Sequence, residues 1–301
     1  PSGRLQGVEQ EGEKTMGKIV IVGSGPAGCS AALYAARAGQ EVVVISMGMG
    51  ALSKAELIQN YYGFEEGITG AELYRQGVAG AKAVGAEFIT AEVVGLDYTG
   101  SLVVQTTEGD YPADAVILAT GTGRIAPKIA GLAEHEGRGV SYCATCDAFF
   151  YRGKTAAVLG SGEYALHEVQ ALLPLAGKVI LCTNGEPLTA DFPEGVEICT
   201  EKLAAVEGEE KVSALRLENG ELLPVEGLFV ALGVAGSAAL ARKLGAPVEN
   251  GRIVVDEKMQ TGIPGLYAAG DCTGGLLQVC KAVYEGALAA TEAIKQIRGK
   301  K

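Results

Sequence analysis

One local pattern occurs twice in this chain and constrains its fold more than any other feature. In each copy a short apolar run leads through a glycine-rich turn into a helix-forming stretch, and a second apolar run follows. The turns read Gly23-Ser24-Gly25-Pro26-Ala27-Gly28 and Gly160-Ser161-Gly162-Glu163-Tyr164-Ala165. The apolar runs lie at 18–22 and 42–45 in the first copy, and at 155–159 and 178–182 in the second. The repeat predicts an α/β fold with two Rossmann-like dinucleotide-binding domains.

The glycine spacing itself indicates the ligand. In a strand–turn–helix context, the first two glycines let the backbone approach a pyrophosphate, and the third allows close packing of helix and strand. The N-terminus of the helix then faces the negative phosphates. The acidic residue that usually ends the second strand is absent from the first copy, where Ser46 stands instead. We therefore expect the ribose contact to come from Ser46, the backbone or another segment.

Length, charge and cysteine usage narrow the class of protein. A chain of 301 residues is long enough for two domains with their own cores. The net charge of −11 argues against nucleic acid or an anionic membrane as a partner. Residues 1–15 are polar and lack a signal-peptide core, so we interpret them as a leader or an expression remnant. The dispersed cysteines do not form a secreted disulfide framework, and this predicts a cytoplasmic protein.

A pair of cysteines lies between the two glycine turns. Cys143 and Cys146 are separated by two residues, and Asp147 follows directly. A thiol pair between two dinucleotide-binding signals predicts an electron relay by thiol–disulfide exchange. A structural zinc site would need a second pair at ligand spacing. The remaining cysteines provide no such pair, so we predict no metal.

Other segments complete the expected sheets. Apolar runs at 87–96, 101–107 and 115–118 read as strands, and the last leads into Thr120-Gly121. Further short strands are expected over 196–235, with linkers near 123–127 and 234–237. Near the C-terminus an apolar strand delivers Asp271 at its carboxyl end, where α/β sheets bind ligands, and a helix follows over about 277–297.

Five motifs in one order resemble a known family. They are the first glycine turn, Ala-Thr-Gly at 119–121, the segment 137–147 with the Cys pair, the second glycine turn, and Ala-Ala-Gly-Asp at 268–271. From residue 16 onward the chain resembles the low-molecular-weight thioredoxin reductases, which are FAD-dependent dimeric disulfide oxidoreductases. The resemblance implies a discontinuous FAD-binding domain, residues 16–125 and 236–301. It also implies an inserted pyridine-nucleotide-type domain, residues 126–235, that carries the Cys pair.

The resemblance also implies roles for individual residues. Cys146 would face the flavin, Cys143 would attack a thioredoxin-like protein or another disulfide substrate, and Asp147 would be the acid–base group. The chain would form a homodimer, and its inserted domain would rotate between two orientations. Lys281 is a candidate donor near the flavin ring, where it would tune the redox potential. FAD would further contact Gly23, Ser24, Gly25, Pro26, Ala27, Gly28, Ser46, Asn60, Thr120, Gly121, Asp271 and Ala282.

The sequence departs from this family at the electron donor. Members that use NADPH carry a basic cluster after the second strand of the inserted domain, where it holds the 2′-phosphate. Residues 181–187 here contain no Arg or Lys. Each missing charge-assisted hydrogen bond is worth roughly 1.5–3 kcal/mol, so we predict a donor other than NADPH. Because the turn itself is intact, residues 160–165 are expected to hold a second dinucleotide, FAD ahead of NADH, with Tyr164 either stacked on a ring or packed at the helix start.

Three alternatives fit the same residues. The chain could be a ferredoxin-dependent flavin thioredoxin reductase that takes electrons from a redox donor protein. It could be a flavin dithiol oxidase that forms disulfides in small molecules and passes electrons to oxygen. It could also be a flavin-binding redox sensor without turnover, although the intact Cys-Ala-Thr-Cys-Asp segment argues against that function.

Overall fold

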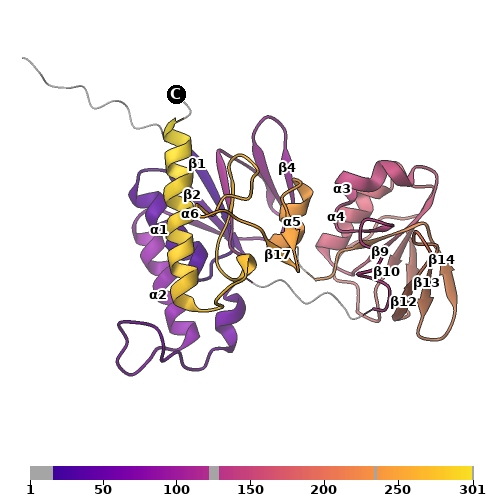
Figure 1. The fold of residues 1–301 in the computed structure, drawn as a ribbon, viewed down its shortest axis with the longest axis horizontal. Coiled ribbons are helices and arrows are strands. Elements are labelled where there is room, and N and C mark those ends of the chain that lie inside the picture. The colour runs from indigo at the N-terminus through magenta and orange to yellow at the C-terminus, as the bar shows by residue number, and fades with distance from the viewer. Residues whose placement is uncertain (1–15, 122–128, 234–235, 300–301) are drawn as a thin grey trace, which may run out of the picture.

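The structure is a computed structural model that describes residues 16–121, 129–233 and 236–299. The expected leader, the first expected linker and residues 234–235 of the second lie outside the described residues. The chain forms two α/β units, each built on a parallel sheet (Figure 1). We call them the first unit and the second unit.

The first unit is built on a five-stranded parallel sheet in the order β18-β7-β1-β2-β3. Alternate residues of its central strands enter two separate cores. Ile19 and Ile21 of β1 pack with helices α1 and α6, whereas Val20 and Val22 pack on the opposite face. Burial on both faces explains why these strands read as continuous apolar runs. The strands are β1 (Lys18–Val22), β2 (Glu41–Ser46), β3 (Glu87–Thr90), β7 (Ala115–Leu118) and β18 (Leu266–Ala268).

Helices cover one face of this sheet, and a small antiparallel sheet packs on the other face (Figure 1). A Cβ on Gly286 of α6 would lie 2.0 Å from the carbonyl oxygen of Ala27, so glycine is what allows α6 to approach the start of α1. The helices are α1 (Pro26–Arg37), α2 (Gly70–Ala83) and α6 (Val279–Gly299), with short turns η1 (Gly50–Lys54) and η3 (Asp271–Thr273). The antiparallel strands are β4 (Val93–Tyr98), β5 (Leu102–Thr106) and β6 (Gly109–Ala113), beside a small hairpin of β16 (Val248–Glu249) and β17 (Arg252–Ile253).

The second unit repeats the design with the strand order β11-β10-β9-β15-β8. Its chain enters after β7 and leaves before β18, so it is inserted into the first unit. The predicted fold class, two Rossmann-like units with the second inserted into the first, is confirmed. Its elements are β8 (Val140–Ser141), α3 (Ala144–Asp147), η2 (Ala148–Tyr151), β9 (Thr155–Leu159), α4 (Glu163–Leu172), β10 (Lys178–Cys182), β11 (Glu197–Cys199), β12 (Leu203–Glu207), β13 (Ala214–Leu217), β14 (Leu222–Pro224) and β15 (Gly227–Val230).

Two expectations about strands need correction. The run 87–96 is not one strand, because the chain breaks at Ala91-Glu92: β3 stays in the parallel sheet and β4 begins the antiparallel one. Strand β6, which contains Pro112, was not expected. It is an edge strand of its sheet, where a residue without an N–H is tolerated.

The two units meet at strand β4 of the first unit. Helix α4 of the second unit packs on β4, and so does helix α5 (Ser237–Lys243), which follows the second unit in the chain (Figure 1). One apolar cluster is continuous across this contact and includes Leu96 of β4, Val169 of α4 and Leu240 of α5. This packing brings the end of α5 to the Cys pair.

Candidate functional site

A cavity of about 330 Å³ runs along the first glycine turn. Of the residues expected to contact FAD, most line this cavity: Gly23, Ser24, Gly25, Pro26, Ala27, Asn60, Thr120, Asp271 and Ala282. Gly28 instead packs behind the turn, since a Cβ there would lie 1.8 Å from the carbonyl oxygen of Gly23. Gly121, with φ +72°, ends the described segment beyond β7.

The turn has the shape that a dinucleotide pyrophosphate requires. A Cβ built on Gly25 would have no other described atom within 4 Å, so the backbone borders open space there. Gly25 is the N-cap of α1, and no described side chain caps this helix, whose N-terminus therefore faces the cavity. The residues present fit FAD.

Ser46 lies beside this cavity in a cluster of hydroxyl groups. Its Oγ is 2.7 Å from Oγ of Ser24, which is 3.1 Å from the hydroxyl of Tyr74 on α2. Across the cavity, Asn60 donates a hydrogen bond of 2.8 Å to Oε1 of Gln278. These hydroxyl groups lie at the end of β2, where the usual motif has an acidic residue that binds the ribose.

Lys281 holds the turn that carries Asp271. Its ammonium donates to the carbonyl of Gly270 and to Oγ1 of Thr273, each at 2.8 Å, and lies 3.0 Å from Glu285. Glu285 in turn accepts the N–H of Gly270 at 2.8 Å. The expectation that Lys281 donates to the flavin ring stays a prediction. Its contacts in this structure stabilise the Gly270–Thr273 turn.

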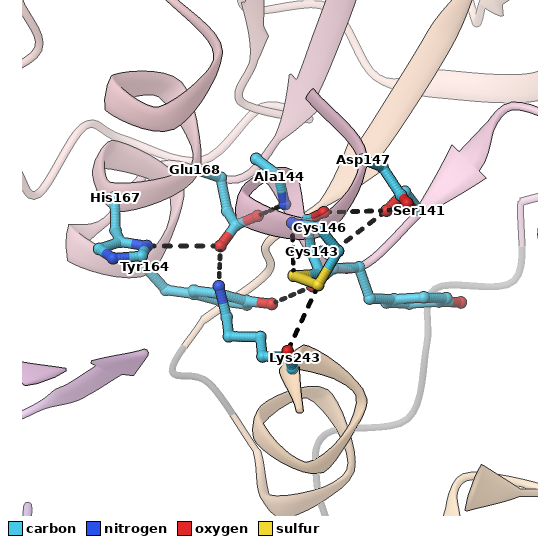
Figure 2. Close-up of polar contacts among 10 residues, drawn as sticks. Ser141, Cys143, Ala144, Cys146, Asp147, Tyr164, His167, Glu168 and Lys243 are labelled. Atoms are coloured by element: carbon cyan, nitrogen blue, oxygen red, sulfur yellow. Dashed lines mark hydrogen bonds and ion pairs between the residues drawn. A yellow bond between two sulfur atoms is a disulfide. The ribbon is translucent and has the colours of Figure 1, made fainter. Parts of the chain in front are cut away.

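Cys143 and Cys146 form a disulfide at the start of α3, with their Cα atoms 5.4 Å apart (Figure 2). Cys143 is the N-cap of this short helix, and its sulfur accepts the N–H of Cys146 at 3.1 Å. Cys143 is 4% exposed, whereas Cys146 is exposed. The sulfur of Cys146 lies 3.5 Å from the carbonyl oxygen of Lys243, on the side of the first unit.

Ser141 links the acid to the Cys pair. Its hydroxyl donates a hydrogen bond of 2.6 Å to Oδ2 of Asp147 and accepts the N–H of Cys143 at 3.1 Å. Asp147 is thus connected through one hydroxyl to the backbone of the buried cysteine (Figure 2). The sequence provided Asp147 but did not indicate Ser141 as its partner.

A buried ion pair that the sequence did not indicate adjoins the disulfide (Figure 2). The carboxylate of Glu168 on α4 accepts the N–H of Ala144, the first residue of α3, and pairs with the ammonium of Lys243 on α5. Both side chains are 1% exposed. The two residues are 75 positions apart, and no local pattern relates them.

Two exposed aromatic side chains follow the Cys pair. Phe149 and Phe150 are 67% and 66% exposed, and their rings meet edge to face at 6.2 Å. The guanidinium of Arg152 lies 5.4 Å from the ring centre of Phe149. Aromatic residues and arginine are enriched at protein contact surfaces. Two aromatic residues so soon after Cys146, in a chain with only 6% aromatic residues, are the sequence signal from which this surface could have been predicted.

The second glycine turn is contacted by side chains of the protein itself. The carboxyl group of Glu92, in the first unit, lies close to the backbone N–H of Tyr164, in the first turn of α4. Thr189 donates its N–H to the carbonyl of Ser161 at 2.8 Å, and its Oγ1 would lie 3.0 Å from a Cβ on Gly162. Tyr164 is 2% exposed and donates its hydroxyl to the carbonyl of Tyr142 at 3.0 Å.

In the described ranges, every helix is too short or too polar to cross a bilayer. The same ranges contain no group of three or more His, Cys, Asp or Glu side chains arranged to hold a metal ion.

The fold, the cavity and the disulfide define a class of redox flavoprotein, and comparison with known proteins agrees. The chain belongs to the pyridine nucleotide-disulphide oxidoreductase family, whose model matches residues 17–286. Within that class it is an oxidoreductase of the thioredoxin reductase type. It is 35% identical to the thioredoxin reductase of Aquifex aeolicus over 94% of each chain.

Two solved structures share the whole architecture. The atypical thioredoxin reductase TRi from Desulfovibrio vulgaris Hildenborough is 40% identical, with 94% of this chain and 98% of that chain covered and a TM-score of 0.88. A ferredoxin-flavin thioredoxin reductase from Clostridium acetobutylicum is 36% identical, with 95% and 99% covered and a TM-score of 0.72. The predicted family resemblance is confirmed.

Proposed function

We propose that this protein reduces the disulfide of a thioredoxin-like protein through Cys143 and Cys146, with FAD bound along the first glycine turn. When bound, FAD supplies the electron pair that reduces the disulfide. The similarity to thioredoxin reductases supports the substrate class. The exposed pair Phe149 and Phe150 supports a protein rather than a small molecule, because it offers an apolar contact surface beside the Cys pair.

The exchange with substrate is a balanced two-electron transfer. The thiolate of Cys143 attacks one sulfur of the substrate disulfide, so that a mixed disulfide forms and one substrate thiolate leaves. Cys146 then attacks the sulfur of Cys143, which regenerates the Cys143–Cys146 bond and releases the second substrate thiolate. The substrate gains two electrons and two protons. Our candidate for the group that holds a proton during this exchange is Asp147, which is linked through the hydroxyl of Ser141 to the backbone N–H of Cys143.

We further propose that the electron donor is a reduced carrier protein of the ferredoxin type. One observation carries this choice: the carboxylate of Glu92 lies at the N-terminus of α4, where a bound dinucleotide would place its pyrophosphate. A carboxyl group in this position competes with a pyrophosphate for the N-terminal N–H groups of the helix. The absence of Arg and Lys from residues 181–187 and the similarity to the ferredoxin-flavin enzyme of Clostridium acetobutylicum support the same donor.

The other donors stay predictions. A second FAD or NADH at residues 160–165 would require Glu92 and Thr189 to withdraw from the turn. The dithiol oxidase needs no nicotinamide clamp either, and the exposed Phe149 and Phe150 favour a protein substrate over its small molecules. The homodimer and the domain boundaries that the resemblance implies belong to this proposal as well.

Flavin stoichiometry combined with an anaerobic titration tests the proposal. We expect one FAD per chain, no bleaching of the flavin by NADPH or NADH, and bleaching by chemically reduced ferredoxin. Reduction of an added thioredoxin should follow. Two FAD per chain would support the second-flavin prediction, and fast bleaching by NADPH would overturn our choice of donor. Rapid reoxidation in air with consumption of a small dithiol would favour the oxidase.

A further inference from the structure

The ion pair of Glu168 and Lys243 joins the two units at the disulfide. Glu168 belongs to α4 of the second unit, and Lys243 is the last residue of α5, which packs on β4 of the first unit. Lys243 also places its backbone carbonyl 3.5 Å from the sulfur of Cys146. Figure 2 shows the side chain of Lys243 beside the Cys pair, extending to Glu168.

Glu168 is connected to the disulfide within its own unit as well. Its carboxylate accepts the N–H of Ala144, the residue between Cys143 and the rest of α3. Nδ1 of His167 lies 3.5 Å from the same carboxylate. Burial by itself raises the pKa of Glu168. The contact with His167 and the charge and hydrogen bond of Lys243 more than offset this, so the pKa lies below the usual range. The carboxylate is therefore ionised at neutral pH.

Each charge of this pair depends on the other. Removing one partner of a buried ion pair leaves the remaining charge without compensation in a medium of low dielectric. If the units separate, water can solvate both groups. The pair therefore favours the orientation in which the units touch, and loss of one member favours separation.

Attack on a protein substrate requires the sulfur of Cys143 to become exposed. Cys143 is 4% exposed while the units are in contact, so its sulfur cannot meet the disulfide of a folded protein in this orientation. In the same orientation the sulfur of Cys146 contacts the carbonyl oxygen of Lys243.

We propose that Glu168 and Lys243 form a latch between the two units, which positions the Cys143–Cys146 pair against the first unit and must open before Cys143 can attack a protein substrate. The inference rests on the proposed function only in assigning the attack to Cys143. The strength of the latch sets how often the disulfide is presented to each side.

The experiment measures how fast Cys143 is alkylated in the FAD-loaded protein. The protein is reduced with a phosphine under anaerobic conditions and treated with iodoacetamide, and peptide mass spectrometry follows Cys143, with exposed Cys146 as an internal reference. We expect Lys243→Met and Glu168→Gln each to accelerate alkylation of Cys143 by about tenfold or more, because either change leaves an unpaired buried charge. The double variant E168Q/K243M removes both charges and should react far more slowly than the product of the two single effects.

A second ion pair provides the control. Lys178 and Glu197 lie 2.6 Å apart on β10 and β11, about half exposed, within the second unit. The variants Lys178→Met and Glu197→Gln should leave alkylation of Cys143 unchanged. A second measurement in the latch variants is steady-state turnover. Easier opening should lower the KM for thioredoxin, and less accurate positioning of Cys146 against the first unit should lower kcat.

The outcomes separate the latch from the proposed function. Alkylation of Cys143 at the parent rate in both single latch variants, or single effects that simply multiply in the double variant, would overturn the latch. Should one single variant fail to fold, the other still decides, since the latch predicts that either unpaired buried charge accelerates alkylation of Cys143. The measurement uses neither donor nor thioredoxin, so failure of the proposed substrate would leave its result intact.

Discussion

The carboxyl group of Glu92 lies close to the backbone N–H of Tyr164, which places an acidic side chain of the first unit at the first turn of helix α4 in the second. Oε1 of Glu92 is buried and has no hydrogen-bond partner among the described atoms. Burial and the nearby charge of Glu163 raise the pKa of Glu92, while the N–H of Tyr164 lowers it, and the net shift is upward. The contact between the units therefore includes a carboxyl group, that of Glu92, whose ionisation is unfavourable.

A Glu92→Gln variant should be more stable than the parent at neutral pH. A carboxyl whose pKa is raised by folding contributes stability below its ordinary pKa, and this contribution is lost as the pH rises through the raised value. The gain should be roughly 1 kcal/mol or less, since the side chain is only partly buried. Thermal melts from pH 4.5 to pH 8 should show the difference growing with pH, whereas the exposed Glu87→Gln should show no such trend.

Replacing Phe149 and Phe150 by alanine should weaken recognition of the protein substrate. Loss of two exposed aromatic contacts should raise the KM for thioredoxin about tenfold or more. Reduction of the bound flavin by dithionite should not change, because both rings point away from the core. Tyr98→Ala, a change at a similarly exposed aromatic on β4, is the matched control. Equal KM values for the three proteins would remove the aromatic pair from the docking surface.

The unpaired cysteines should differ sharply in reactivity. Burial raises the pKa of Cys29 to about 12 and that of Cys272 to about 11, where the neighbouring Ser237 partly opposes the effect of burial. Burial also raises the pKa of Cys182. Because the thiolate is the reactive form, an aromatic disulfide reagent at pH 8 should first label the exposed Cys280 in the native oxidised protein. Cys280→Ser should abolish this fast phase, and a fast phase that persists would contradict the assignment.

Alanine substitutions at two glycines of the first turn should have different effects, one on the stability of the fold and the other on flavin content. Gly28→Ala would place a Cβ 1.8 Å from a backbone oxygen and should destabilise the fold by about 3 kcal/mol or more. Gly25→Ala has φ −69° and open space around the new methyl group, so the apo-protein should melt as the parent does. Its ratio of flavin to protein absorbance should nevertheless fall, because the methyl group enters the cavity. Full flavin content in Gly25→Ala would argue against this position for the pyrophosphate.

Local features of the chain were predictable because short-range physics sets them. A strand buried on both faces must be apolar throughout, and a turn that approaches a pyrophosphate needs glycine, so β1, α1, β9 and α4 can be read directly from the residues. The Cys pair is equally local, since Cys143 and Cys146 share one helical turn. The break at Ala91-Glu92 was not predictable, because each half of that run is a good strand and only the pairing partners differ.

By itself, then, the sequence determined the α/β class, the repeat of the dinucleotide-binding unit, the Cys pair and the loss of the basic clamp, all of which depend on residues a few positions apart. Only the tertiary structure decided which side chains meet at the boundary between the units. Glu92 with Tyr164 and Glu168 with Lys243 come from segments far apart in the chain, and an isolated acidic or basic residue carries no sign of a distant partner. Burial makes such partners necessary, since a charge removed from water needs compensation nearby.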